Sequence, residues 1–224
     1  MRPRALSPIS LQAANMQISK IFVLWAFALS FAAVNVNRVP AQTSIALSVY
    51  GAFSGATSGN GVEESPSNSA GGLFELRHIS NPLLGWEATY AYNRANQVYA
   101  SSGYACPVQG PCPNPSTAPV SANAHEITGD WTPSVHIGRV RPFGVLGIGA
   151  LLNLPAGGQS NTTSDNKAVY VYGAGLDWGL IPHIGLRLQY RGNLYKAPDV
   201  TKLYTSTNAF THTAEPVVGA YFRF

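Results

Sequence analysis

Regular alternation of large apolar residues with small or polar ones constrains the fold more than any other feature of this sequence. It is clearest at 184–191 (IGLRLQYR), 170–178 and 84–93. Weaker alternation marks positions 45–51, 74–77, 125–131 and 218–224, and positions 143–152 are apolar on both sides and rich in Gly. A repeat of two residues is the period of a β-strand, because successive side chains point to opposite faces. The sequence therefore predicts an all-β chain with eight strands.

The charged residues of these segments share one face, opposite the large apolar and aromatic side chains. They are Glu75, Arg77, Glu87, Glu126, Asp130, Asp177, Arg187, Arg191, Glu215 and Arg223. Only 11% of the chain is charged, whereas an ordinary globular domain carries about 25%. In a bilayer, a charged side chain on the lipid face costs about 2–4 kcal/mol at the midplane. We therefore expect the charges inside a membrane barrel, with the first eight of them forming a charge network.

The links between the predicted strands alternate between short and long. Short links lie at 80–82, 136–138 and 181–183. Long links, rich in Gly, Ser, Asn, Pro and Thr, lie at about 55–70, 94–122, 153–167 and 196–210. Short turns at one end and long loops at the other are the layout of an outer-membrane barrel. The predicted fold is an eight-stranded antiparallel up-and-down transmembrane β-barrel.

A soluble periplasmic lipocalin-like barrel that binds a ligand stays open as an alternative, because it has the same periodicity with the two faces reversed. Aromatic residues such as Trp86 and Trp178 would then form a packed core, and the charges would face water. Soluble sheets guard their surfaces with Lys, and Lys is nearly absent from the predicted strands. This favours the membrane barrel.

The N-terminal segment has the features of an export signal. Its apolar run at 21–34 has 14 residues, fewer than the 20 or so that span a bilayer as a helix. A positive charge precedes the run and small residues end the segment, as in a cleaved signal peptide. We predict a signal peptide at 1–41 and an outer-membrane barrel domain at 42–224. Met1 and Met16 both stay open as the start.

The net positive charge of the chain comes from this N-terminal segment. It holds four of the 14 Lys and Arg residues and none of the 10 acidic residues, which leaves the remainder balanced. We therefore expect no nucleic-acid partner.

The two cysteines, Cys106 and Cys112, fall in one Pro-rich stretch. In an exported protein such a pair is expected to form a local disulfide that closes a loop. The histidines are dispersed, without the spacing of metal ligands. We expect no metal site and no cofactor.

Residues 172–191 (YGAGLDWGLIPHIGLRLQYR) and 220–224 (AYFRF) resemble the OmpA-like outer-membrane β-barrel family. The resemblance implies a small barrel in the outer membrane of a Gram-negative-type bacterium, surrounded by outer-membrane lipid. It also implies that Phe222 and Phe224 belong to the signal read by the barrel-assembly machinery. The chain leaves no room for the peptidoglycan-binding domain of full-length OmpA proteins, so we expect no anchoring to the cell wall.

An eight-stranded barrel is just wide enough to be filled by its own side chains, which excludes a wide pore. We expect a structural or surface-interaction role, with the long loops as the place where an extracellular ligand would bind. Whether the charged interior is a closed core or a gated path for ions or protons stays open, although buried charge pairs are commonly structural.

A lipid-modifying enzyme is the second alternative. His78 and Ser80 resemble the His-x-Ser motif of lipid A deacylases, in which a base activates a Ser nucleophile, and Glu87 follows seven residues after Ser80. The motif lies at a short turn, on the periplasmic side of the predicted barrel, whereas that family acts on the outer leaflet. We therefore expect no catalytic site.

Overall fold

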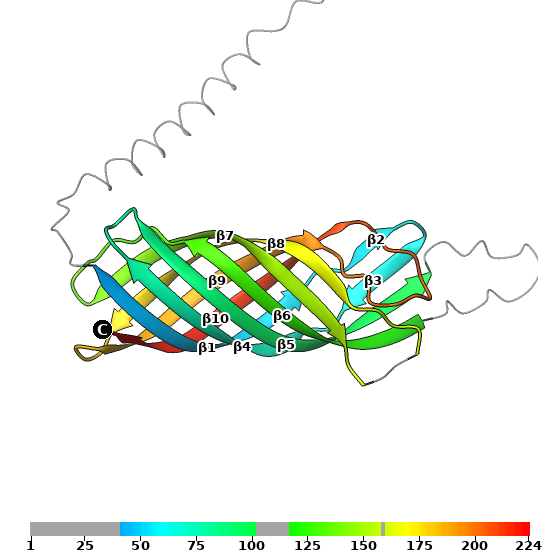
Figure 1. The fold of residues 1–224 in the computed structure, drawn as a ribbon, viewed down its shortest axis with the longest axis horizontal. Helices are drawn as coiled ribbons and strands as arrows, with labels where there is room; N and C mark the ends of the chain where they lie inside the picture. Colours follow the sequence, from blue (N-terminus) through cyan, green and yellow to red (C-terminus); the bar gives the residue numbers. More distant parts are fainter. Residues whose placement is uncertain (1–40, 102–116, 158–159) are drawn as a thin grey trace, which may run out of the picture. The chain divides into compact units, whose positions relative to one another are not determined.

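The strands of the computed structural model close into a barrel (Figure 1). The structure describes residues 41–101, 117–157 and 160–224. The barrel strands are β1 (Gln42–Ser54), β4 (Ser69–Ile79), β5 (Gly85–Ser101), β6 (Thr117–Trp131), β7 (Val140–Pro155), β8 (Asp165–Gly179), β9 (Ile184–Lys196) and β10 (Phe210–Arg223). Each pairs antiparallel with the next, and β10 returns to β1, where Ile45 lies opposite Phe222. The predicted eight-stranded antiparallel barrel is confirmed.

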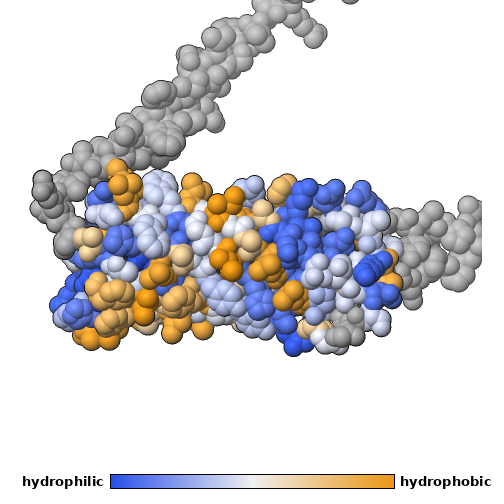
Figure 2. All heavy atoms as spheres, viewed as in Figure 1, coloured by the Kyte–Doolittle hydropathy of each residue, from blue (hydrophilic) through white to orange (hydrophobic). Residues whose placement is uncertain are grey.

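The outer wall of the barrel carries the large apolar and aromatic side chains. Trp86, Trp178 and Leu188 are about half exposed there. Figure 2 shows apolar residues gathered over the strands, and mainly hydrophilic ones over the end that holds two further short strands, β2 (Thr57–Gly59) and β3 (Val62–Pro66). Charged residues of the same strands are buried on the opposite face. This arrangement contradicts the lipocalin-like alternative, in which the aromatic residues would form the core.

The three short links form tight turns at one end of the barrel, as the sequence predicts. In the turn between β8 and β9, Leu180 N donates to Ile184 O at 3.1 Å. Phe224 N donates to Thr43 O at 3.0 Å, so β10 ends beside the start of β1. We call this end of the barrel the short-turn end and the opposite one the loop end.

The strands at the loop end are longer than predicted. The link expected at 94–122 is wrong at both sides, because β5 and β6 stay paired as far as Ala100 and Thr117. The first long link also contains strand, since β2 and β3 form a hairpin that pairs with the outer part of β5. Asn60 and Gly61 make its turn with positive φ angles of 52° and 76°, as hairpin turns of two residues require. The outward-facing positions of this part of β5 include Arg94 and Asn96, so the strand pairing continues without the apolar alternation.

Two predictions fall on parts of the chain outside the described residues. These are the signal peptide, apart from Ala41, and the disulfide between Cys106 and Cys112. Within the described residues, no helix has the length and hydropathy needed to cross a membrane.

Candidate functional site

Two hairpins in the short-turn half of the barrel each carry a pair of opposite charges. Arg77 on β4 lies opposite Glu87 on β5, and Asp177 on β8 lies opposite Arg187 on β9. Arg77 Nε donates to Glu87 Oε2, and Arg187 Nε donates to Asp177 Oδ1 at 2.7 Å. Each pair spans one short turn, so local hairpin geometry brings its two members together.

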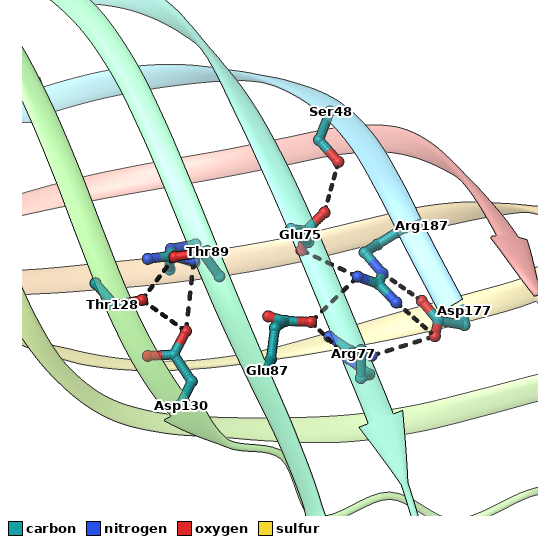
Figure 3. Close-up of polar contacts among 10 residues, drawn as sticks. Ser48, Glu75, Arg77, Glu87, Thr89, Thr128, Asp130, Asp177 and Arg187 are labelled. Carbon is teal, nitrogen blue, oxygen red and sulfur yellow. Dashed lines mark hydrogen bonds and ion pairs between the residues drawn. The ribbon is translucent and has the colours of Figure 1, made fainter. Parts of the chain in front are cut away.

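The two pairs meet across the lumen, because β4 and β5 stand on the wall opposite β8 and β9 (Figure 3). Arg77 Nη1 lies 3.2 Å from Asp177 Oδ2, and Arg187 Nη1 lies 3.2 Å from Glu87 Oε2. Arg187 Nη1 also lies 3.1 Å from Glu75 Oε1. Two guanidinium groups and three carboxylates thus form one buried cluster, which we call the central network.

A second charged layer lies next to the central network, toward the loop end, and is built around Arg191. The guanidinium lies 2.9 Å from Glu126 Oε1, 3.7 Å from Asp130 Oδ2 and 3.8 Å from Glu215 Oε2. Asn193 Nδ2 donates to Glu126 Oε2 at 2.8 Å. Three carboxylates around one guanidinium give this layer a formal surplus of two negative charges when all are ionised.

The structure therefore places all eight residues of the predicted charge network inside the barrel, in two adjacent layers. An aromatic ring adds to the filling, since the guanidinium carbon of Arg77 lies 3.8 Å from the centre of the Phe143 ring. Beside Glu126 and Glu215 the side chains leave a cavity of about 30 Å³. That volume holds about one or two water molecules.

The side chains that would form the His-x-Ser site lie on different faces of the barrel wall. The His78 ring is half-buried on the outer wall, where Nδ1 lies 2.9 Å from Thr43 Oγ1 and the ring centre lies 5.9 Å from that of Trp86. Ser80 is exposed in the following turn. Glu87 is 1% exposed and points into the lumen. The wall of the barrel separates this carboxylate from the imidazole, so it cannot orient the ring as a catalytic base.

The predicted assembly-signal residues, Phe222 and Phe224, both lie on the outer wall. They are 44% and 65% exposed, and their ring centres are 6.3 Å apart. Both rings are therefore accessible from outside the barrel.

Sequence analysis missed two arginines at the short-turn end. Arg139 and Arg141 line a recess there together with Arg223. A signal was available in the sequence, because the two arginines directly follow the short link at 136–138, at the end of the barrel where the last strand also finishes.

At the loop end, the link at 197–209 folds onto the β2–β3 hairpin. Tyr99 Oη donates to Pro198 O at 2.7 Å and accepts from Val200 N at 3.2 Å. Val200 is fully buried against Tyr99 and Val62. We call β2, β3 and residues 197–209 the loop cap. No local pattern predicts this cap, because its residues have the composition of ordinary polar links.

Glu64 lies buried in the loop cap with an exposed fraction of 2%, and its Oε1 has no hydrogen-bond partner among the described residues. Burial, together with the charges of Asp199 and Asp165, raises the pKa of Glu64 to about 8, although the charge of Lys167 opposes this rise. This carboxyl is therefore mainly protonated near neutral pH. The described part of the chain contains no group of three or more His, Cys, Asp or Glu side chains that could hold a metal ion.

Neither a family model nor a curated protein matches this sequence. Among solved structures, Neisserial surface protein A is similar at 13% identity with a TM-score of 0.52, covering 81% of this chain and 97% of its own. The outer membrane protein OprG from Pseudomonas aeruginosa is similar at 11% identity with a TM-score of 0.50, covering 83% of this chain and 96% of its own. The chain thus has the OmpA-like fold of a small eight-stranded outer-membrane barrel.

Proposed function

We propose that this protein is an integral outer-membrane barrel with a closed interior and a structural or surface-interaction role. One observation carries the proposal: the barrel wall separates two kinds of side chain. The central network pairs its charges across the lumen, whereas residues such as Trp86 and Leu188 face outward. Closure also satisfies the backbone hydrogen bonds of every strand, as hydrocarbon requires. A barrel with apolar side chains outside and charged side chains inside is suited to a bilayer and not to water.

The outer membrane of a Gram-negative-type bacterium is the proposed location. The shared fold with outer-membrane barrels supports it, as does the export signal read from the sequence. In this scheme the chain is cleaved after Ala41, and Phe222 and Phe224 contact the assembly machinery. Mass spectrometry of the membrane-extracted protein tests the cleavage. Replacing Phe224 by Ser should lower the amount of assembled barrel without changing its synthesis.

The closed interior follows from charges that cross the lumen from opposite walls. Because the central network links β4 and β5 to β8 and β9, an ion would have to separate paired groups in order to pass. We expect no wide-pore conductance when the purified protein is inserted into planar bilayers. Steady, porin-like current would overturn the closed interior.

The loop end is the proposed interaction surface. In its cap, Tyr99 Oη donates to Pro198 O and accepts from Val200 N, and Asn60 Nδ2 donates to Ser206 O at 2.8 Å. An ordered surface on a rigid barrel suits binding, because less conformational freedom is lost on contact. The partner would be an extracellular ligand.

Gel mobility and cell fractionation test the whole proposal. The membrane-extracted protein should migrate faster in SDS unboiled than boiled, and it should fractionate with the outer membrane. A soluble periplasmic protein without this shift would refute the membrane barrel. Deleting residues 102–116 should then abolish binding of an extracellular ligand while leaving the mobility shift intact.

We propose no lipid-modifying activity, because His78 and Glu87 occupy opposite faces of the wall. Overexpression should leave the mass spectrum of lipid A unchanged, both for the wild type and for His78→Ala. A mass change that disappears in His78→Ala would establish the enzyme instead.

A further inference from the structure

A recess opens into the barrel at its short-turn end, with a volume of about 350 Å³. Inward-facing strand residues and residues of the short turns line it together. They include Ser44, His136, Arg139, Arg141, Tyr221 and Arg223. We call this space the mouth recess. Its volume falls within the range of pockets that hold small molecules.

Three arginines line the mouth recess, and the side-chain partners of two of them, Arg141 and Arg223, are neutral. Arg141 is 8% exposed, and its Nη2 donates to Gln42 Oε1 at 2.6 Å. Arg223 Nη2 donates to Pro182 O at 2.8 Å. Within the described residues, none of Arg139, Arg141 and Arg223 has a carboxylate oxygen within 4.0 Å. None of the three therefore forms an ion pair with a carboxylate of the described residues.

The carboxylate that lines the recess, Asp177, is already engaged. Its Oδ1 accepts from Arg187 Nε at 2.7 Å, and its Oδ2 lies 3.2 Å from Arg77 Nη1. It lies opposite Arg141 in the sheet register, but its two oxygens contact guanidinium groups of the central network and form no ion pair with the arginines of the mouth recess. The recess is therefore a basic site, with Arg141 buried and Arg139 exposed, whose arginines have no ion-pair partner of their own.

The pKa of His136, in the turn at the rim of the recess, reflects burial and the positive charge of these arginines. Burial lowers the pKa of His136, and the charges of Arg141 and Arg223 lower it further. A second cation is thus disfavoured beside these arginines, whereas an anion is favoured.

We propose that the mouth recess binds a phosphate-type oxyanion. A guanidinium is a planar fork of donors that matches phosphate oxygens. Three such groups need more acceptors than the two oxygens of a carboxylate supply, and a phosphate monoester has three terminal oxygens. Ser44 and Tyr221 line the same space, and each has a hydroxyl group that can donate. The volume exceeds that of bare phosphate, so a small group such as glycerol or a sugar can enter with it.

The same phosphate chemistry could come from a soluble phosphate ester or from a phospholipid headgroup. Ser44, Arg141 and Tyr221 are on the inner face of the wall, so a soluble ligand can enter along the barrel axis. A lipid headgroup would have to bend over the rim from outside. The inner position favours the soluble ester, and the experiment separates the two sources.

Isothermal titration of the purified barrel in a non-ionic detergent tests the proposal, with inorganic phosphate and glycerol 3-phosphate as probes. We expect saturable binding of glycerol 3-phosphate that Arg141→Gln weakens about tenfold or more, the effect of losing one charge-assisted hydrogen bond. The matched control is Arg94→Gln, which removes the same charge from an exposed site on the loop half of β5 and should leave the affinity unchanged. If Arg141→Gln fails to give the heat-sensitive gel shift, the exposed Arg139→Gln takes its place.

A second arm uses vesicles of phosphatidylglycerol and of an uncharged glycolipid, with the NMR signal of the Arg141 side chain as the readout. If the Arg141 signal shifts only in phosphatidylglycerol vesicles and the soluble probes do not bind, the phosphate site is retained and its ligand is a lipid headgroup. The proposal is overturned when neither soluble phosphate nor phosphatidylglycerol affects Arg141, or when Arg94→Gln weakens binding as much as Arg141→Gln does.

Discussion

Removing the guanidinium of Arg187 is expected to destabilise the barrel strongly. Arg187 is fully buried and lies within 3.2 Å of carboxylate oxygens from Glu75, Glu87 and Asp177. The variant Arg187→Met keeps most of the side-chain length but leaves three buried carboxylates with Arg77 alone. Removing one partner of a buried ion pair typically costs about 3–5 kcal/mol, because the other charge stays buried without compensation. We expect a loss of that size in the free energy of unfolding.

Removing a carboxylate from the same network should have a much smaller effect. The central network has three acids and two arginines, so Glu75→Gln makes it neutral, whereas Arg187→Met makes it more negative. The amide can still accept from Arg187, and Ser48, whose Oγ donates to Glu75 Oε2 at 2.8 Å, can turn its hydroxyl group toward the new donor. The expected cost is below about 1.5 kcal/mol, the net value of one ordinary hydrogen bond.

Urea unfolding of the protein in phospholipid vesicles, followed by the loss of the fast-migrating gel band, measures both variants. The matched control is Arg94→Met, the same substitution at an exposed position, which should stay within about 0.5 kcal/mol of the wild type. The asymmetry between Arg187→Met and Glu75→Gln is the critical result. Equal losses in the two variants, or a loss below about 1 kcal/mol for Arg187→Met, would refute the charge argument.

Three further predictions concern the outer wall and the loop cap. The first is Leu188→Arg, on the lipid face at the middle of β9, which should lower the unfolding free energy by about 2–4 kcal/mol. Its control is Leu203→Arg, at a similarly exposed Leu in the loop cap, which should leave the unfolding free energy unchanged in the same urea assay. Because the raised pKa of Glu64 makes the folded chain keep a proton that the unfolded chain releases, stability should fall as pH rises from about 4.5 to about 8; Glu64→Gln should remove this fall when urea midpoints are compared across that window. Tyr99→Phe leaves the carbonyl oxygen of Pro198 without its donor and should cost about 1–3 kcal/mol, seen as faster proteolysis of the loop cap.

The faces of the strands could be predicted because a slip of one residue would reverse every side chain of a strand. Arg187 and Arg191 are four positions apart, so they had to share a face, and Leu188 had to take the other. Only a lumen lets so many charges avoid both lipid and a packed apolar core. The alternation was therefore sufficient to group the charges on one face of the barrel strands, the shortage of Lys favoured the inner face, and the structure places them there.

The loop end could not be predicted in the same way, because its strands lose the contrast between lipid and lumen. Gln97 and Tyr99 on β5 continue the inward-facing series, but their outward neighbours need not be apolar once the strand leaves the bilayer. Burial of Val200 and Glu64 then depends on how two links pack together over the lumen. That contact joins residues more than 100 positions apart, and no local pattern encodes it.

The charge order within the two hairpins explains why the partners in the central network lie where they do. In the first hairpin the base, Arg77, precedes the acid, Glu87; in the second the acid, Asp177, precedes the base, Arg187. Because β4 stands opposite β8 and β5 opposite β9, this reversal sets unlike charges against each other across the lumen. The same order in both hairpins would keep each local pair but place arginine against arginine and acid against acid. Turn geometry alone thus accounts for the local pairs, whereas the reversal makes sense only in a closed barrel whose opposite walls touch.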